Sequence, residues 1–329
     1  MIKITLLLWI SGFITLAYSQ VNGPTPTGKL IDVGGYKLHL NIEGRGNIPV
    51  VFENGSGDFS FIWSLVQPEI TKITKTVSYD RAGYAWSDPG PFPRTGEQIT
   101  LELHTALHKA GIKTPFILVG QSFGGFLVRE YARRYPDDVA GLVLVDVLNE
   151  NSRVMIGGKP MRIREFASGK TIPRAITYFK PVQISDTIPW DTAIYFPLNK
   201  LSKEIQQQQI WSQSQNKYRA ASNNEMESSP EDVANLYKHK GEADYKFGDK
   251  PLIVLSRGDG GYAGRPDSTL LEKERMDLQK DLSKLSSNSL HIIDKNSGHN
   301  IHLEDPKLVI AAILEVLTSL KEKRPLRSF

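Results

Sequence analysis

Two patterns of apolar residues alternate along the chain, and each predicts a different secondary structure. Apolar and polar residues alternate singly in residues 29–33 and 36–43, which predicts two strands joined at Gly34-Gly35 into a hairpin. Between residues 97 and 110 apolar residues recur every three or four positions, which predicts a helix. Other short segments have the character of strands, namely residues 50–52, 76–79, 116–119, 141–145, 251–255 and 290–294. Strands that alternate with helices are typical of a parallel sheet with helices on both faces.

The composition is that of a globular protein that can bury a sizeable core. Of the 329 residues, 40% are hydrophobic and 23% are charged. The 40 Lys and Arg exceed the 36 Asp and Glu by only four, and no basic run is interleaved with aromatic residues, so we expect no nucleic-acid partner. The chain has no cysteine, which excludes disulfides, thiolate metal sites and a cysteine nucleophile.

The first residues have the pattern of a secretion signal. Residues 1–3 give a positively charged start, residues 4–17 are apolar, and small side chains follow at the positions that a signal peptidase recognises. The apolar run is shorter than the ~20 residues that span a bilayer, so an uncleaved anchor is the weaker alternative. The sequence therefore predicts a signal peptide over residues 1–19, cleaved between Ser19 and Gln20, and a secreted or periplasmic protein.

The segment after residues 116–119 carries the pattern Gly120-x-Ser122-x-Gly124, followed by a helical period. A strand before this pattern and a helix after it are the context of a nucleophile elbow, whose apex residue takes a strained backbone conformation. A side chain at either glycine would collide with the neighbouring strand or helix. The pattern predicts that Ser122 stands above the sheet edge at the positive end of a helix and acts as a nucleophile. An ordinary glycine-rich turn is the alternative.

A serine hydroxyl needs an adjacent base at neutral pH, and His299 is the best candidate among the seven histidines. His299 lies in the loop after the predicted strand 290–294, so it reaches the same sheet edge as Ser122. His302, three residues later, is expected to pack in the structure or to contact a lid.

Several short segments of the sequence, in their order along the chain, resemble the α/β-hydrolase fold superfamily, in particular its serine hydrolases with a helical cap. The resemblance extends from about Lys29 to Leu320. It is carried by residues 53–57, 79–88, 120–124, 142–146 and 297–306. It implies an α/β fold with a mostly parallel central sheet, flanking helices and an inserted helical cap.

The resemblance also implies an oxyanion hole made of two backbone N–H groups. One donor would be Phe123, the residue after the nucleophile, and the other would be Ser56, with Gly55 as the alternative. Phe59 and Trp63 follow this loop closely, so we expect them to contact the substrate.

Two aspartates compete for the role of the acid that orients His299. Asp259 follows the predicted strand 251–255, at a loop position that the family commonly uses. Asp146 ends the strand 141–145, at an alternative position used by some capped members. Asp146 is slightly favoured, and both remain candidates.

About a hundred residues between the strands 141–145 and 251–255 show no sheet pattern, and they contain helical stretches at residues 198–221 and 230–240. The sequence therefore predicts a cap over the nucleophile. The expected division is a signal peptide (1–19), a linker (20–28), a first core segment (29–149), the helical cap (150–248) and a second core segment (249–322).

The resulting hypothesis is a secreted serine hydrolase that cleaves a carboxylic ester of a small molecule, with no cofactor. We expect no metal either, because His104 and His108 share a helix face but no third ligand is evident. A proline-iminopeptidase-like enzyme is the alternative, in which acidic cap residues hold a free amine: Glu225, Glu227, Glu231 and Asp232. A non-catalytic binding protein that keeps the fold is the last alternative.

Overall fold

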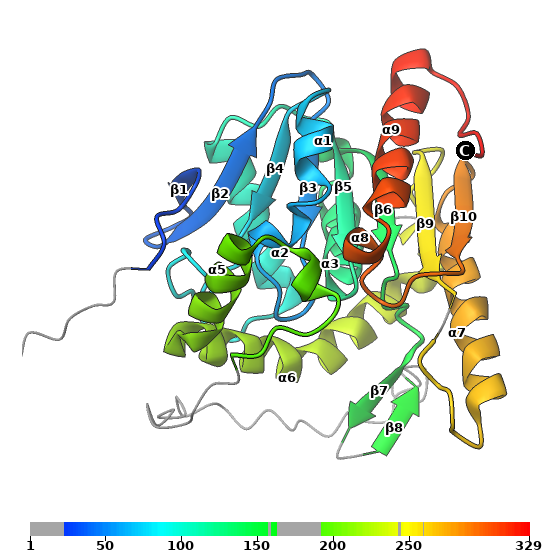
Figure 1. The fold of residues 1–329 in the computed structure, drawn as a ribbon. Helices are drawn as coiled ribbons and strands as arrows, with labels where there is room; N and C mark the ends of the chain where they lie inside the picture. The colour runs from blue at the N-terminus through cyan, green and yellow to red at the C-terminus, as the bar shows by residue number, and fades with distance from the viewer. Residues whose placement is uncertain (1–22, 157–158, 163–191, 243–244, 259) are drawn as a thin grey trace, which may run out of the picture.

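The computed structural model describes residues 23–156, 159–162, 192–242, 245–258 and 260–329. The predicted signal peptide therefore lies outside the described residues. The centre of the fold is an eight-stranded sheet with the order β1-β2-β4-β3-β5-β6-β9-β10 (Figure 1). Helices cover both of its faces, so the predicted α/β fold with a mostly parallel sheet and flanking helices is confirmed.

The sheet is antiparallel at one edge and parallel elsewhere. β1 (Lys29–Asp32) and β2 (Lys37–Glu43) form the predicted hairpin, and β2 also runs antiparallel to β4. All other neighbouring strands are parallel. They are β3 (Val50–Glu53), β4 (Thr76–Tyr79), β5 (Phe116–Gln121), β6 (Val139–Val145), β9 (Leu252–Arg257) and β10 (Ser289–Asp294). Their carboxyl ends meet at one sheet edge, where ligand sites of such folds form.

The core consists of two apolar layers, one on each face of the sheet. On β5, Leu118 packs into one layer, whereas Ile117 and Val119 pack into the other, as the two-residue period of a strand requires. The first layer is completed by α2 (Gly96–Lys109) and α3 (Phe123–Arg134). The second is completed by α1 (Gln67–Thr71), α8 (Ile301–Glu304) and α9 (Pro306–Glu322). Asp305 accepts a hydrogen bond from the backbone N–H of Leu308 and caps α9.

The segment between β6 and β9 differs in detail from the sequence prediction. It contains a two-stranded antiparallel hairpin, β7 (Arg153–Ile156) and β8 (Lys159–Arg162), where no strand is expected from the sequence. In the described part of this segment the α-helices are α5 (Lys203–Ser214) and α6 (Asn216–Lys238), and α6 continues through Pro230. A proline in the first turn of a helix is easily accommodated, which is why the sequence favours a helix start there. In the structure the boundary between the two helices comes earlier, at Gln215.

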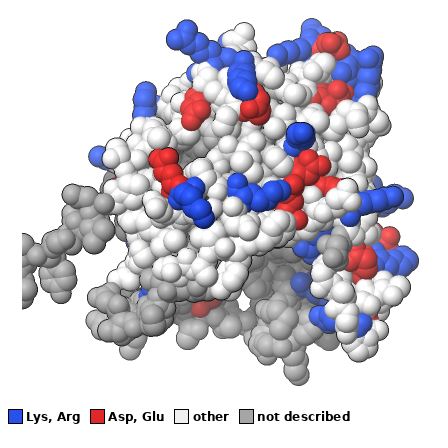
Figure 2. All heavy atoms as spheres, in the orientation of Figure 1, with Lys and Arg blue, Asp and Glu red and all other residues white. Residues whose placement is uncertain are grey.

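The remaining described elements are one helix and several short 3₁₀ helices. α7 (Ser268–Leu282) lies between β9 and β10, and short 3₁₀ helices are η1 (Ser60–Trp63), η2 (Pro136–Asp138), η3 (Leu198–Lys200), η4 (His239–Gly241) and η6 (Ser283–Leu285). Figure 2 shows acidic and basic side chains interspersed on one face of the molecule, in keeping with the small net charge. Within the described ranges no helix combines the length and the apolar content needed to cross a membrane.

Candidate active site

Ser122 occupies a tight turn between β5 and α3. Its φ and ψ angles are 52° and −118°, a combination that costs free energy for a residue with a side chain. A Cβ atom at Gly120 would lie 2.6 Å from the carbonyl oxygen of Gly124, and one at Gly124 would lie 2.5 Å from the carbonyl oxygens of Glu53 and Asn54. The strained bend and the need for both glycines therefore agree with the sequence prediction.

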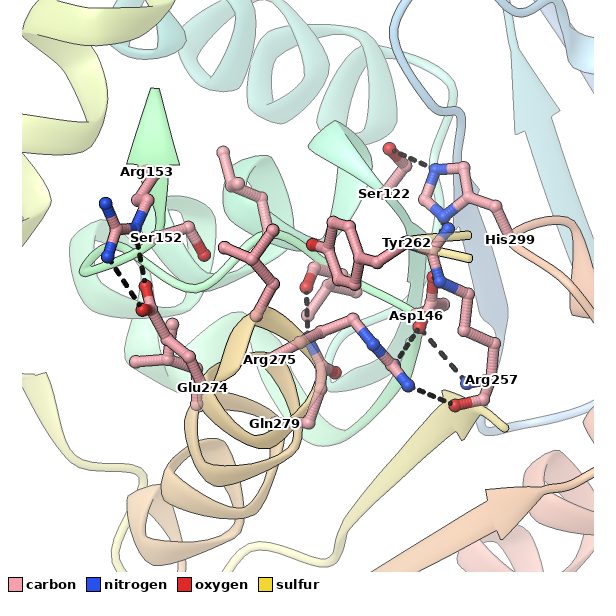
Figure 3. Close-up of a pocket in the computed structure, with 14 residues that line it drawn as sticks. Ser122, Asp146, Ser152, Arg153, Arg257, Tyr262, Glu274, Arg275, Gln279 and His299 are labelled. Atoms are coloured by element: carbon pink, nitrogen blue, oxygen red, sulfur yellow. Dashed lines mark hydrogen bonds and ion pairs between the residues drawn. The ribbon is translucent and has the colours of Figure 1, made fainter. Parts of the chain in front are cut away.

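The imidazole of His299 lies between the side chains of Ser122 and Asp146 (Figure 3). Its Nε2 is 2.9 Å from Ser122 Oγ, and its Nδ1 is 2.6 Å from Asp146 Oδ2. Ser122 follows β5, Asp146 follows β6 and His299 follows β10, so the parallel strands deliver all three groups to one sheet edge. The geometry is that of a nucleophile, a base and an acid that orients the base.

The Asp146 side chain has further partners besides His299. Its side chain is buried, and Oδ1 accepts a hydrogen bond from the backbone N–H of Arg257 at 3.1 Å. The guanidinium groups of Arg257 and Arg275 lie 3.5 Å and 3.7 Å from its two oxygens. These contacts leave Oδ2 directed at His299. The other candidate acid, Asp259, lies outside the described residues.

The loop after β3 is fixed by the buried guanidinium of Arg81. Arg81 donates hydrogen bonds to the carbonyl oxygens of Asn54 at 3.0 Å and Gly55 at 2.8 Å. In a trans peptide the N–H points opposite to the carbonyl of the same unit, so the N–H groups of Gly55 and Ser56 both point away from Arg81. Phe123 is the first residue of α3, and its N–H therefore has no acceptor within the helix. The predicted oxyanion donors therefore belong to two segments near Ser122. Phe123 follows it directly in the chain, and Gly55 and Ser56 lie in the loop after β3.

Phe59 and Trp63 lie elsewhere than the sequence suggests. Both are completely buried, and neither belongs to the lining of the pocket at Ser122. The Trp63 indole N–H donates to the Asn54 side chain at 2.9 Å, and the Phe59 ring packs 5.0 Å from that of Tyr218. Trp63 therefore finds its hydrogen-bond acceptor inside the protein and Phe59 packs against an aromatic ring, so both side chains support the loop and not the pocket beside Ser122.

A cavity of about 220 Å³ opens beside the reactive groups (Figure 3). Ser122 and His299 line it together with residues that sequence analysis does not identify, among them Arg257, Tyr262 and Arg275. Arg257 is the last residue of β9, so its position at the carboxyl edge is a signal present in the sequence. Arg275 is on α7, where the periodicity of the helix does not reveal that this face meets the site.

Burial shifts the pKa values of ionisable groups around the loop after β3. It raises the pKa of Glu53 to about 7 and that of Asp58 to about 6, although the positive charge of Arg81 opposes both shifts. Burial also lowers the pKa of His302 to about 3, which keeps its imidazole neutral. His302 is completely buried against the Trp63 ring, with centroids 4.9 Å apart, and it packs in the core as the sequence suggests.

Two of the four acidic residues of α6 have structural partners, whereas Glu227 and Glu231 are exposed. Glu225 is buried, with Oε1 3.1 Å from Arg81 Nε and Oε2 accepting from the Tyr84 hydroxyl at 2.7 Å. Asp232 is also buried and accepts from the backbone N–H of Gly96 at 2.8 Å, at the start of α2. These two carboxylates are therefore engaged in joining α6 to the sheet domain.

Comparisons with known proteins agree with this architecture. A protein-family model described as "alpha/beta hydrolase fold" matches residues 48–306. The uncharacterized protein YqjL of Bacillus subtilis is 25% identical over 291 residues, which cover 88% of this chain and 91% of that protein. A thermophilic esterase from Thermogutta terrifontis matches with a TM-score of 0.59 and 17% identity, covering 89% of this chain and 98% of that one. The epoxide hydrolase CorEH matches with a TM-score of 0.61 and 18% identity, covering 89% and 99%. At these identities the structural matches show the fold alone.

Proposed function

Because the chain belongs to the alpha/beta hydrolase fold family, we propose that it is a serine hydrolase that cleaves a carboxylic ester through an acyl-enzyme on Ser122. The observation that carries the proposal is the continuous contact from Ser122 Oγ through the His299 imidazole to Asp146 Oδ2, with distances of 2.9 Å and 2.6 Å.

The first half of the reaction forms the acyl-enzyme. His299 Nε2 accepts the proton of the Ser122 hydroxyl as Oγ attacks the ester carbonyl, which makes a tetrahedral intermediate with a negatively charged oxygen. Asp146 accepts the hydrogen bond from Nδ1, so it fixes the tautomer of His299 and stabilises the imidazolium. The same proton then passes from Nε2 to the departing alkoxide, and the alcohol leaves.

Backbone N–H groups stabilise the oxyanion in both tetrahedral intermediates. Phe123 supplies one donor, and Ser56 supplies the second, with Gly55 as its alternative. Each donor of this kind is worth roughly 2.7–4 kcal/mol of barrier. In the second half, His299 Nε2 takes a proton from water as the water oxygen attacks the acyl carbonyl. The second tetrahedral intermediate then collapses, the proton passes from Nε2 to Ser122 Oγ, and the carboxylic acid leaves.

Two observations favour an ester over the other reactions considered. A serine nucleophile gives an acyl-enzyme, whereas epoxide and alkyl halide cleavage in related folds begins with a carboxylate nucleophile. A peptidase needs free carboxylates at the site to hold an amine. Glu225 is bonded to Arg81 and Asp232 to the N–H of Gly96, and the exposed Glu227 and Glu231 do not line the pocket at Ser122. No reaction step calls for a metal or an organic cofactor.

We further infer that the segment 150–248 is a cap and that the protein is exported. Support for the cap comes from α6, where the hydroxyl of Tyr218 donates to the carbonyl of Gly57 at 3.0 Å, within the loop beside Ser122. Export rests on the pattern of residues 1–19. N-terminal sequencing of the mature protein tests export, and a first residue other than Gln20 would contradict the predicted cleavage.

Active-site labelling tests the proposal directly. A fluorophosphonate probe reacts with a serine whose hydroxyl is activated, so we expect labelling of the wild type and none of Ser122→Ala. Ser287→Ala, a change at an exposed serine, is the matched control and should label fully. Hydrolysis of p-nitrophenyl esters should follow the same order. An unlabelled wild type, or labelling that persists in Ser122→Ala, would contradict the serine mechanism, and cleavage of prolyl-nitroanilide in preference to the esters would contradict the substrate class.

A further inference from the structure

A second group of polar side chains lies at the edge of the sheet opposite the pocket. His104 and His108 stand one turn apart near the carboxyl end of α2, and Asp138 is the last residue of η2, directly before β6. Asp138 and Asp146 therefore flank the same strand at its two ends. β6 is 7 residues long, so eight residue steps separate the two aspartates, which is roughly 26 Å at about 3.3 Å per residue. The cluster is consequently remote from the reactive serine.

Three side chains converge on a single oxygen of this cluster. Asp138 Oδ2 lies 3.0 Å from His104 Nδ1 and 3.0 Å from His108 Nε2, and it accepts a hydrogen bond from the Tyr131 hydroxyl at 2.9 Å. The two imidazole centroids are 4.2 Å apart. His104 Nδ1 also lies 3.1 Å from the Tyr131 hydroxyl, so the cluster can be closed by hydrogen bonds alone when both imidazoles carry a proton on these nitrogens. When the same nitrogens present lone pairs instead, three ligand atoms face one another and a cation can occupy the space between them.

We propose that His104 Nδ1, His108 Nε2 and Asp138 Oδ2 bind a divalent transition-metal ion, best matched by Zn²⁺, with water as a fourth ligand. Two imidazole nitrogens and one carboxylate oxygen are a ligand set that zinc accepts, with bonds of about 2.0–2.2 Å. Such bonds place the atoms of a tetrahedron about 3.3 Å apart. The three candidate atoms all lie within 4.8 Å of one another, so small side-chain rotations complete the site.

The surroundings suit a cation. Tyr135 stacks on His104 with centroids 3.8 Å apart and an interplanar angle of 8°, which holds that imidazole in place. Tyr131 can keep its hydrogen bond to Asp138 after metal binding and so orient the carboxylate. The carbonyl groups at the carboxyl end of α2 contribute partial negative charge near His108. The His108 side chain is 46% exposed, so an ion can reach the site from solvent.

A metal ion at this site would link two segments of the fold and would take no part in the proposed reaction. His104 and His108 belong to α2, whereas Asp138 belongs to the connection between α3 and β6. A metal ion that binds the folded protein and not the unfolded chain stabilises the fold according to its concentration and affinity. Zinc binding should therefore raise the melting temperature of this protein.

Calorimetric titration and thermal unfolding with ZnCl₂ at pH 8 test the site, on chelator-treated protein that carries no histidine tag. We expect one ion per chain. At a free concentration 100 times the Kd, the melting temperature should rise by roughly 5 °C. Co²⁺, used as a spectroscopic probe, should give the visible absorption of a tetrahedral complex.

Variants distinguish this cluster from other histidines. His108→Gln should weaken zinc binding by more than roughly 10–100-fold, which is the loss typical of removing a group that only orients a metal ligand. The melting temperature of the metal-free variant should stay near that of the wild type. His239→Gln, at another half-exposed histidine near a helix end, should bind as the wild type does. His299→Gln should also bind normally, which separates the cluster from the reactive site. Absence of one-to-one binding in the wild type, or equal binding in His108→Gln, would show a hydrogen-bonded cluster only and overturn the proposal.

Discussion

Ser122 and Asp146 both have positive φ angles, 52° and 44°, and each directly follows the last residue of a strand, β5 and β6, which are parallel neighbours. The backbone N–H of Ser122 donates to the carbonyl of Val145 at 3.2 Å, so the two bends are linked. Each bend turns its side chain out of the strand direction and toward the same edge. The two bends thus set the separation between the Ser122 and Asp146 side chains, and the His299 imidazole bridges that separation.

The acid partner of His299 can be identified by exchange of each aspartate for asparagine. Asp146→Asn removes the charge that stabilises the imidazolium, so we expect kcat for a p-nitrophenyl ester to fall by roughly 10³–10⁴-fold. Asp259→Asn should reduce kcat by less than about tenfold. Steady-state kinetics on the two purified variants measure this difference. The reverse ranking would assign the role to Asp259.

The nucleophile turn should not tolerate a methyl group at Gly124. Gly124→Ala places Cβ 2.5 Å from the carbonyl oxygens of Glu53 and Asn54, so the backbone must move. We expect the free energy of unfolding in urea to fall by about 1–3 kcal/mol or more. Gly241→Ala is the matched control, because nothing lies within 4 Å of its Cβ position, and it should change stability by less than about 0.5 kcal/mol. Equal stability of the two variants would show that the turn is not tightly packed.

Arg81 should control the rate more than the substrate affinity. A lysine cannot bond the carbonyl oxygens of Asn54 and Gly55 and the two buried glutamates at once, so Arg81→Lys loosens the loop that carries the Ser56 N–H. We expect kcat to fall by about tenfold or more, with KM changed less than about threefold.

Arg94→Lys provides the control for this effect. Arg94 is another buried arginine, and it is paired with Glu102. Its replacement should lower the melting temperature while leaving kcat nearly unchanged. A comparable loss of kcat in both variants would mean that the rate follows general stability and not the position of the loop.

Asp232 should make the protein less stable as the pH rises. Burial raises its pKa from the ordinary 3.8 to about 8, and the negative charges of Glu130, Glu231 and Glu225 contribute, whereas the N–H of Gly96 opposes the shift. Between these two pKa values the folded protein keeps a proton that the unfolded chain loses. The free energy of unfolding therefore falls with pH across this window, by at most about 1.4 kcal/mol per pH unit from this group.

Asp232→Asn tests this dependence, because asparagine can still accept from Gly96 but does not ionise. The stability of the variant relative to wild type should increase from pH 4 to pH 8 and then level off, as measured by urea unfolding at several pH values. Asp249→Asn, a change at an exposed aspartate, is the matched control. A constant difference for Asp232→Asn would contradict a raised pKa.

Several features of the site follow from local sequence because their causes are local. The bend at Ser122 needs a strand, two glycines and a helix, all within about ten residues, and the sequence displays each of them. The position of His299 follows almost as directly, since a loop at the carboxyl end of a parallel strand must reach the same sheet edge. Pro230 shows the limit of local reasoning, because a first-turn proline and a proline inside a longer helix have similar neighbours.

Sequence by itself determined the fold class, the strained turn at Ser122 and the sheet edge at which His299 lies, because periodicity and turn chemistry act between residues that are close along the chain. Only the tertiary structure decided that Asp146 contacts His299, that Phe59 and Trp63 face the interior, that Arg81 holds the loop after β3, and that Asp138 joins the two histidines of α2. Those relationships depend on the directions in which distant segments approach one another. Directions of this kind are set by packing of the whole core, which no local pattern encodes.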